Sequence, residues 1–270
     1  TSTMKRNFGS ALLAICTLLT VSSCSKKEGC TDPTATNYDP DAEKNVGCLY
    51  EETYAVEMHV HQFLNDIELE EEMPYVINGV NTNLNLAQFY VSGITLVDAN
   101  GNEFKQDGLY LLVQPETEEY AIGDFPAGDY TSVKFDIGID SATNHGDPSL
   151  YPIGDPLGAQ TPSMHWGWSF GYIFMRIDGE VDSDGDGTPD PAGAFEMHLG
   201  TDHYLASIEV EMPISIGQGL ENIVHLQADY TSFFTGVDMV NDNTTHTTDN
   251  VTLANLLLDN IYTMFSPGEE

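Results

Sequence analysis

Residues 54–64 read YAVEMHVHQFL, and apolar and polar side chains alternate between residues 56 and 61. A period of two residues is typical of a β-strand with one face on a core and the other face outward. Further segments favour strands in the same way, and they lie at residues 85–97, 109–113, 132–139, 165–177, 194–199, 204–212 and 222–228. The sequence therefore predicts an all-β fold, a mostly antiparallel β-sandwich, over residues 52–270.

The C-terminal end of this domain has a different period. Apolar side chains recur there at the spacing of one helix face, at Leu253, Leu256, Leu257, Ile261 and Met264. Thr248 or Asp249 stands where an N-cap is expected. We therefore expect the sandwich to end in an α-helix.

The N-terminal segment has the pattern of an export signal. Lys5 and Arg6 precede a short apolar stretch at residues 8–21, and small residues then lead to Cys24. This order resembles a lipobox, in which the cysteine is acylated. The alternative is an ordinary signal peptide with a chance cysteine. We predict a signal peptide at 1–23 and an outer-membrane lipoprotein, facing the periplasm or the cell surface and held in the membrane by the lipid on Cys24.

Two further cysteines follow the lipobox. Cys30 and Cys48 bracket a turn-rich stretch that has too few apolar residues to build a core of its own. Cysteines in exported chains usually pair, and small modules depend on such bonds. The sequence therefore predicts a Cys30–Cys48 disulfide in a short stalk at residues 24–51.

The charge balance is strongly acidic. The chain has 43 Asp and Glu against 8 Lys and Arg, for a formal net charge of −35. Because phosphate binding needs clustered basic side chains, this composition excludes nucleic acid as a natural ligand. An acidic surface suits cation binding, although most of these carboxylates are expected simply to be solvated.

One acidic segment has the spacing of a calcium loop. Asp182, Asp184, Asp186 and Asp190 alternate with small residues, and Gly185 and Gly187 permit a sharp turn. Ca²⁺ prefers several oxygen ligands around one point. We expect a truncated Ca²⁺ loop, with a solvated acidic hairpin tip as the alternative.

Histidine and tryptophan indicate a second kind of metal site. His59 and His61 share one strand face with Glu57, and His198 shares its face with Glu196. If 165–177 is one strand, Trp166 and Trp168 share a face with Phe170, Tyr172 and Phe174, which also describes an ordinary core strand. A methionine precedes each of His59, His165 and His198. Imidazole with thioether or aromatic neighbours suits copper, whereas the alternative is a set of solvent-exposed polar residues.

Five motifs in order resemble the MbnP-like domain, and the resemblance covers residues 54–265. They are FYVSGITL at 89–96, FPAGDY at 125–130, FDIGID at 135–140, MHWGWSFGYIF at 164–174 and FEMHLG at 195–200. The resemblance implies an exported, non-catalytic copper-binding protein. It also implies a di-haem partner related to cytochrome c peroxidase, which oxidises a tryptophan to kynurenine.

Carried onto this chain, the resemblance gives a set of ligands. The oxidised residue would be Trp166 or Trp168, His198 would be one histidine ligand, and His59 or His61 would be the other. The chain contains none of the phosphate-binding loops, nucleophile elbows or zinc-protease motifs that mark common enzymes, so we predict that it is not an enzyme. The alternative function is a surface-interaction or glycan-binding lipoprotein stiffened by Ca²⁺.

Overall fold

The computed structural model describes residues 26–33, 35–167 and 169–269. The predicted signal peptide, Cys24 and Trp168 therefore lie outside the described residues. The chain divides into two compact units, Thr1–Glu51 and Glu52–Glu270. Among the described residues, no helix has the length and apolar character needed to cross a membrane.

The first unit is held together by short pairings and one disulfide. Strand β1 (Glu28–Gly29) pairs in parallel with β2 (Lys44–Asn45). Cys30 and Cys48 form a disulfide, as the sequence predicts, and Cys30 is buried. With so little apolar surface in this unit, the covalent bond is the main constraint on its fold.

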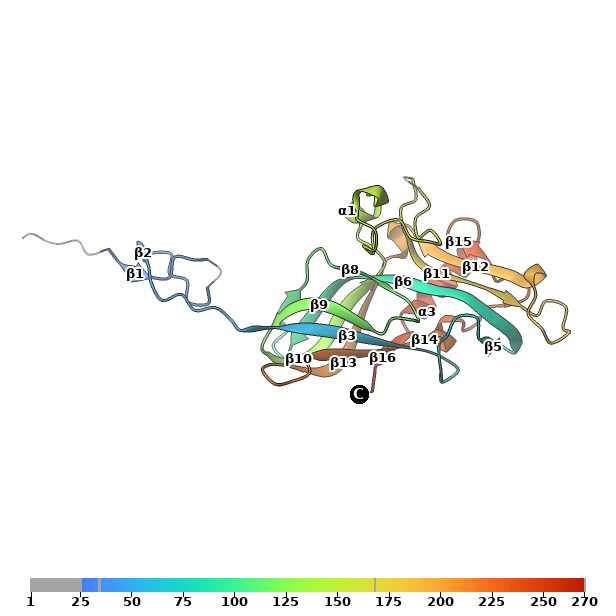
Figure 1. The fold of residues 1–270 in the computed structure, drawn as a ribbon, viewed down its shortest axis with the longest axis horizontal. Helices are drawn as coiled ribbons and strands as arrows, with labels where there is room; N and C mark the ends of the chain where they lie inside the picture. The colour runs from blue at the N-terminus through green and yellow to red at the C-terminus, as the bar shows by residue number, and fades with distance from the viewer. Residues whose placement is uncertain (1–25, 34, 168, 270) are drawn as a thin grey trace, which may run out of the picture. The chain divides into compact units, whose positions relative to one another are not determined.

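The second unit is a sandwich of two sheets (Figure 1). The larger sheet follows the order β13-β10-β6-β11-β12-β15, and β5, β7 and β8 pair with the long central strand β6. Its strands are β5 (Pro74–Ile77), β6 (Val80–Asp98), β7 (Glu103–Lys105), β8 (Tyr110–Val113), β10 (Gly128–Ile137), β11 (Ile173–Val181), β12 (Ala194–Gly200), β13 (Ala206–Ile216) and β15 (Thr245–His246).

The smaller sheet follows the order β16-β14-β3-β4, and β9 pairs with β3. Its strands are β3 (Thr53–Leu64), β4 (Ile67–Glu68), β9 (Glu119–Pro126), β14 (Ile223–Asp229) and β16 (Phe265–Pro267). Most pairings are antiparallel, which confirms the predicted sandwich. Two are parallel, β3 with β14 and β12 with β15, and both matter for the sites below.

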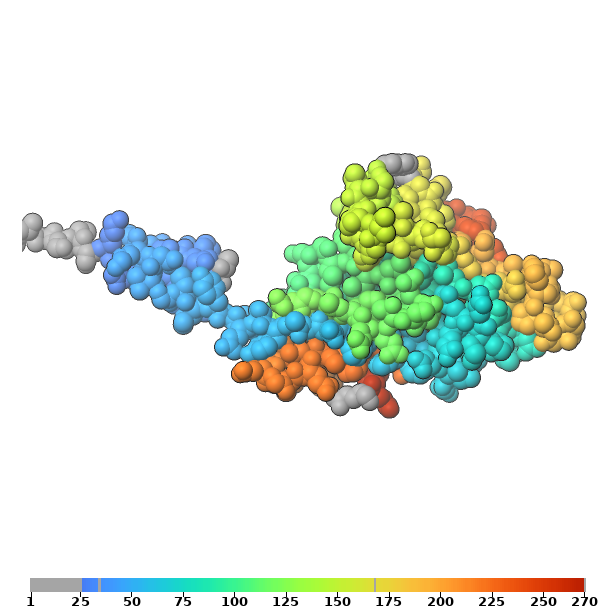
Figure 2. All heavy atoms as spheres, in the orientation of Figure 1, coloured from blue at the N-terminus to red at the C-terminus, as the bar shows by residue number. Residues whose placement is uncertain are grey.

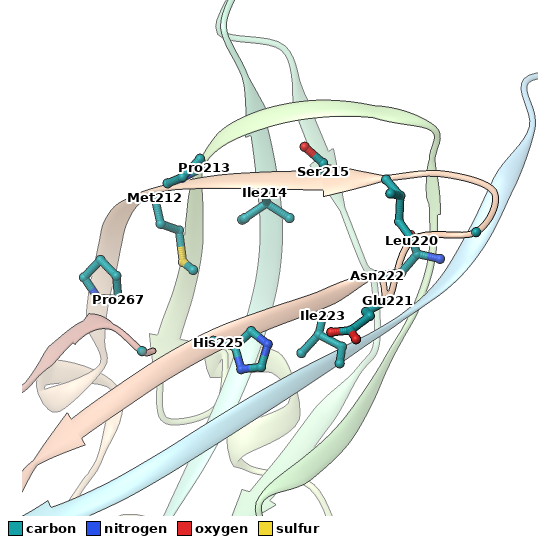
Figure 3. A pocket seen from close by; sticks show the side chains of 12 residues that line it. Met212, Pro213, Ile214, Ser215, Leu220, Glu221, Asn222, Ile223, His225 and Pro267 are labelled. Carbon is teal, nitrogen blue, oxygen red and sulfur yellow. The ribbon is translucent and has the colours of Figure 1, made fainter. Parts of the chain in front are cut away.

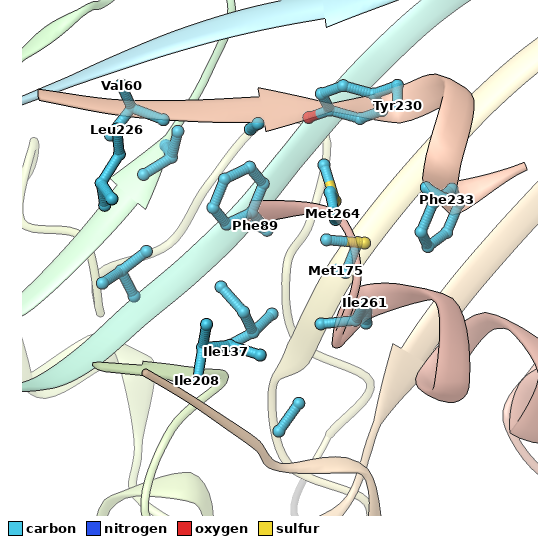
Figure 4. Close-up of a cluster of buried hydrophobic side chains, with 14 of the residues drawn as sticks. Val60, Phe89, Ile137, Met175, Ile208, Leu226, Tyr230, Phe233, Ile261 and Met264 are labelled. Carbon is cyan, nitrogen blue, oxygen red and sulfur yellow. The ribbon is translucent and has the colours of Figure 1, made fainter. Parts of the chain in front are cut away.

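The hydrophobic core lies between the two sheets. Figure 4 shows Val60 and Leu226 from the smaller sheet facing Phe89 and Met175 from the larger one. These side chains come from alternate positions of their strands, so the intervening positions point away from the core. The polar positions of each strand are therefore displayed on the outer face of its sheet.

The predicted C-terminal helix is α3 (Val251–Ile261), and Leu253, Leu257 and Ile261 on it join the core. Its N-cap is Asn250, whose side chain accepts a hydrogen bond from the Leu253 amide. The prediction of Thr248 or Asp249 as the cap is wrong, because the Asp249 carboxylate binds His246 instead. A shorter helix, α2 (Tyr230–Phe233), precedes it in the chain.

A long segment at residues 140–172 covers part of the outer face of the larger sheet. It contains α1 (Ser141–Asn144) and the short 3₁₀ turn Pro148–Leu150. Two further 3₁₀ turns, Pro191–Gly193 and Asp202–Tyr204, flank β12. In Figure 2 the yellow-green part of the long segment projects from the surface of the second unit. It buries a second hydrophobic cluster that includes Tyr90, Tyr172 and Phe174.

The aromatic segment departs from the predicted strand at 165–177. Strand β11 begins only at Ile173, and the preceding residues form a turn in which the Phe170 and Gly171 amides donate to the Gly167 carbonyl. Gly167 and Gly171 have φ values of 112° and 78°, which favour glycine and interrupt an extended strand. Phe170 is therefore exposed whereas Tyr172 is buried, and the predicted shared aromatic face does not form.

Candidate metal centre

The predicted histidine ligands lie on two different sheets. His59 and His61 project from the outer face of β3, in the smaller sheet, whereas His198 projects from the outer face of β12, in the larger sheet. Alternation along each strand directs these side chains away from the core that separates the sheets. The structure therefore does not bring His198 together with His59 or His61, contrary to the ligand set expected from the sequence.

His198 belongs to a buried polar network on β11 and β12. Its Nε2 lies 2.6 Å from an Asp178 carboxylate oxygen, and Arg176 donates to the other oxygen of Asp178 from Nε at 2.8 Å and Nη2 at 2.7 Å. Burial alone would raise the pKa of Asp178, but its hydrogen bonds with His198 and Arg176 outweigh this effect and lower the pKa. Asp178 is therefore a carboxylate at neutral pH.

The Asp178 carboxylate determines which nitrogen of His198 is available as a ligand. Because a carboxylate only accepts hydrogen bonds, His198 donates from Nε2–H, which leaves Nδ1 as the ring nitrogen that can offer a lone pair to a ligand. This Nδ1 is buried and has no hydrogen-bond partner among the described residues. A carboxylate behind a histidine is the usual arrangement for orienting a metal-ligating imidazole.

His246 is the histidine neighbour of His198 and is not among the ligands predicted from the sequence. Strands β12 and β15 pair in parallel with His198 opposite His246, and the ring centroids lie 4.9 Å apart. Burial alone would lower the pKa of His246, but hydrogen bonds to Asp249 at 2.8 Å and Glu196 at 3.0 Å raise it. In the sequence, the spacing of His246 and Asp249 gives only a weak indication that His246 belongs to a metal site.

Trp166 shares a pocket with His246. It lines a pocket of about 280 Å³ with Phe170, His246 and the three threonines Thr201, Thr247 and Thr248. Gly200, two residues beyond His198, leaves room for the Trp166 ring, because a Cβ at this glycine would lie 2.6 Å from Trp166 Cζ3. The structure thus places the predicted residue Trp166 in one pocket with His246, and Trp166 also lies close to Gly200, on the same strand as His198.

The methionines that precede the histidines are not metal ligands in this geometry. Met58, Met164 and Met197 are all buried in hydrophobic clusters. On a strand, neighbouring residues point to opposite faces, so Met58 and Met197 turn away from the histidines that follow them. The three Met-His pairs therefore reflect packing rather than thioether ligation.

His165 is held inside the aromatic turn. Its Nδ1 accepts a hydrogen bond from the Gly167 amide at 2.9 Å, and its ring packs edge-on against Tyr172 with centroids 4.7 Å apart. Burial lowers the pKa of His165 and outweighs the opposing effect of Asp147. The neutral His165 ring therefore helps to fix the turn that presents Trp166.

The remaining predicted residues form two other groups. Carboxylate oxygens of Asp182, Asp184 and Asp186 lie within 4.8 Å of one another. Asp190 is not in that group, because its carboxylate accepts hydrogen bonds from the Ala192 amide and the Ser183 hydroxyl. His59 and His61 gather instead with His225, which the sequence analysis also missed.

Comparison with known proteins gives a family for this fold. No curated protein sequence matches the chain. The solved structure of MbnP from Methylosinus trichosporium has the same fold, with a TM-score of 0.56 and 17% sequence identity over 75% of this chain and 87% of that one. The family model described as MbnP matches residues 53–250, nearly three quarters of the sequence, and the chain therefore belongs to the MbnP family.

Proposed function

We propose that this protein is an exported, lipid-anchored copper-binding protein, and that the copper ion binds between His198, His246 and Trp166. The observation that carries the proposal is the buried Nδ1 of His198, which has a lone pair and no partner while Asp178 occupies the other ring nitrogen. A buried acceptor without a partner costs roughly 1–3 kcal/mol. A bound metal ion would remove that cost.

The surrounding residues have separate tasks in this proposal. Asp178 holds the His198 ring in one tautomer and orientation, and Arg176 holds Asp178. His246 would exchange one of its two carboxylate contacts for the metal. Two imidazoles leave coordination positions open, and Cu⁺ and Cu²⁺ both accept imidazole nitrogen. An open site of this kind suits capture and release of the ion rather than catalysis.

Oxidation of a tryptophan would supply a third ligand. We propose that a di-haem partner related to cytochrome c peroxidase uses a peroxide as oxidant to cleave the indole C2–C3 bond of Trp166 or Trp168. Two oxygen atoms enter the ring, the peroxide is reduced to water, and hydrolysis then releases C2 as formate to leave kynurenine, whose aryl amine can bind copper. Trp166 lines an open pocket and packs over a glycine, so an oxidising partner could approach its ring. The lipid on Cys24 would keep the protein in the exported compartment where that partner also works.

The proposal is tested with protein purified from cells that express such a partner and from cells that do not. Copper affinity is measured by competition with a chelator, and peptides that contain Trp166 and Trp168 are analysed by mass spectrometry. We expect His198→Gln to bind one copper ion fewer than wild type, and we expect a mass change on one tryptophan only when the partner is present. Unmodified tryptophans together with wild-type copper stoichiometry and affinity in His198→Gln would rule out this site.

The acidic loop supports a separate proposal of a structural Ca²⁺ ion. Asp182, Asp184 and Asp186 converge, and Asp182 also accepts hydrogen bonds from the Gly185 and Gly187 amides, which orders the loop around the carboxylates. Oxygen ligands at this density favour Ca²⁺ over copper. The ion would stabilise the connection between β11 and β12 without taking part in copper binding.

A further inference from the structure

Three histidines outside the proposed copper site converge on the outer face of the smaller sheet. His59 and His61 stand two residues apart on β3, so both point to the same face. His225 on β14 lies directly opposite His59 in the parallel pairing of these strands. Parallel register across two segments far apart in the sequence therefore creates the cluster.

The rings of the three histidines lie close enough to share one ion. The centroid of His225 is 5.1 Å from that of His59 and 6.0 Å from that of His61, and the His59 and His61 centroids are 6.5 Å apart. One ring nitrogen from each histidine lies within 4.8 Å of the others. Metal–imidazole bonds are about 2.0–2.1 Å long, so small side-chain rotations suffice to bring three nitrogens onto one ion.

These histidines are also partly removed from water. All three are half-buried, and His61 Nε2 is buried with no hydrogen-bond partner among the described residues. His59 Nε2 lies 3.5 Å from Glu57, beyond good hydrogen-bond geometry. Nitrogen atoms without partners are costly in a merely solvated face, and they are what a metal ion would satisfy.

The charge around the cluster favours a cation. Glu57 and Glu119 each bring a carboxylate oxygen within 4.8 Å of a His59 nitrogen and of one another. Glu119 belongs to an acidic surface that also contains Glu68, Glu116 and Glu118. A cleft lined by charges of one sign raises the local concentration of counter-ions. Either nearby carboxylate, or water, could complete the coordination of an ion on three histidines.

His225 also lines a cleft of about 560 Å³ between the ends of β13 and β14, together with Met212, Ile223 and Pro267 (Figure 3). The proposed copper site, on the outer face of the larger sheet, has a separate pocket.

We propose that His59, His61 and His225 form a second metal site, for a late first-row transition-metal ion such as Zn²⁺ or Cu²⁺. Neutral imidazoles select these ions over Ca²⁺ and Mg²⁺, which require oxygen. Three histidines with an open fourth position form an established type of zinc site. The inference does not depend on the copper site, because the two sites share no residue.

The probe is Zn²⁺, titrated calorimetrically into the full chain after metal has been removed with a chelator. His61→Gln and His225→Gln remove one ligand each, from β3 and β14. We expect each variant to bind Zn²⁺ at this site at least about tenfold more weakly than wild type, since even loss of an outer-shell partner costs 10–100-fold. His203→Gln, an exposed histidine outside every described metal-ligand group, should change nothing. His246→Gln should retain the Zn²⁺ bound by the three histidines.

A second measurement uses unmodified protein and so does not depend on how the variants fold. Nuclear magnetic resonance of ¹⁵N-histidine side chains should show that the rings of His59, His61 and His225 shift together on addition of Zn²⁺. The proposal is overturned if only His198 and His246 shift, or if His61→Gln and His225→Gln bind Zn²⁺ as the His203→Gln control does. Failure of the copper experiment would leave these results unaffected.

Discussion

Replacement of Asp178 by asparagine tests the network that orients His198. The Asp178 carboxylate accepts three charge-assisted contacts, from His198 Nε2 at 2.6 Å, Arg176 Nη2 at 2.7 Å and Arg176 Nε at 2.8 Å. The asparagine side chain has the same shape, but it lacks the negative charge and offers one acceptor oxygen. Its amide nitrogen can also donate to His198, which would move the ring proton to Nδ1 and block the proposed ligand atom.

The expected loss of stability follows from this geometry. Each hydrogen bond to a charged group contributes about 1.5–3 kcal/mol. Asparagine can retain at most the two Arg176 hydrogen bonds, which share one oxygen of Asp178, and it retains them at reduced strength because the acceptor is no longer charged. The side chains of Asp178, Arg176 and His198 are 18%, 16% and 5% exposed, so water compensates little. We therefore expect Asp178→Asn to lower the free energy of unfolding by about 3 kcal/mol.

The loss should depend on pH with a definite sign. The folded-state pKa of Asp178 is lowered, so its contribution is present above the unfolded-state pKa of about 3.9 and is lost as pH falls through the lower folded-state value. Urea denaturation at pH 7 and at pH 3 measures both values. The difference between wild type and Asp178→Asn should be full at pH 7 and smaller at pH 3.

Copper affinity supplies the second readout. Outer-shell partners of metal-ligating histidines contribute 10–100-fold to affinity, so we expect Asp178→Asn to weaken copper binding by this factor. Asp259→Asn, at an exposed carboxylate on α3, is the matched control and should change stability by less than about 0.5 kcal/mol. Unchanged copper affinity in a destabilised Asp178→Asn protein would show that the network is structural only, and unchanged stability would refute the network itself.

Three further predictions concern the proposed copper site and the acidic loop. Because the pKa of His246 is raised, copper binding should weaken as pH falls through a value above about 6.5. Asp249→Asn removes one cause of the raised pKa and should move the midpoint of this loss to lower pH. A pH titration of copper affinity in which the midpoint does not move would contradict the role of His246. In Gly200→Ala the new Cβ would lie 2.6 Å from both Trp166 Cζ3 and the Tyr172 carbonyl oxygen. Urea denaturation should therefore show a free energy of unfolding lower by about 1–3 kcal/mol, and the fluorescence of Trp166 should change. The control Gly217→Ala, where the nearest atom lies 3.6 Å from the new Cβ, should leave both readouts as in wild type. Removal of Ca²⁺ with a selective chelator should lower the melting temperature but leave copper affinity intact. If the chelator lowers the melting temperature of Asp182→Asn/Asp184→Asn protein as much as that of wild type, the loop is not the Ca²⁺ site.

Alternating residues on single strands were sufficient to predict much of the fold. The predicted strand at 54–64 corresponds to β3, and that at 222–228 corresponds to β14. The same alternation correctly placed His59 with His61, and His198 with Glu196, on the same face of their strands. These are local properties, because the pleat of one strand is enough to determine them.

The aromatic segment shows where local pattern was insufficient. Trp166, Phe170 and Tyr172 have the composition of a strand, and their spacing fits one. Two glycines with positive φ convert the segment into a turn, and Asn144 stabilises it by accepting a hydrogen bond from the Tyr172 amide at 2.8 Å. Glycine marks a possible turn in a sequence, but whether a strand pattern or a turn prevails depends on the packing of distant residues.

The partners of the metal sites could not be read from the sequence for a related reason. His225 and His246 are single histidines in segments without a metal motif, and each becomes significant only through a parallel pairing with a distant strand. Such pairings link segments that a long connection separates, and their register is determined by the whole sandwich. Local spacing therefore identified one half of each proposed site, and the neighbouring half came from a strand pairing that the sequence does not show.

The two sites share a mode of construction that explains how one domain could hold two ions. In each, a parallel strand pair places two histidines side by side, His59 with His225 and His198 with His246, at ring distances of 5.1 Å and 4.9 Å. Each pair lies on the outer face of a different sheet, and the shared hydrophobic core separates them. Because the two sites share no residue and lie on opposite sides of the core, occupancy of one site should leave the affinity of the other unchanged. Additive binding of Zn²⁺ at the three histidines and copper at His198 would distinguish this arrangement from a single site that several histidines share.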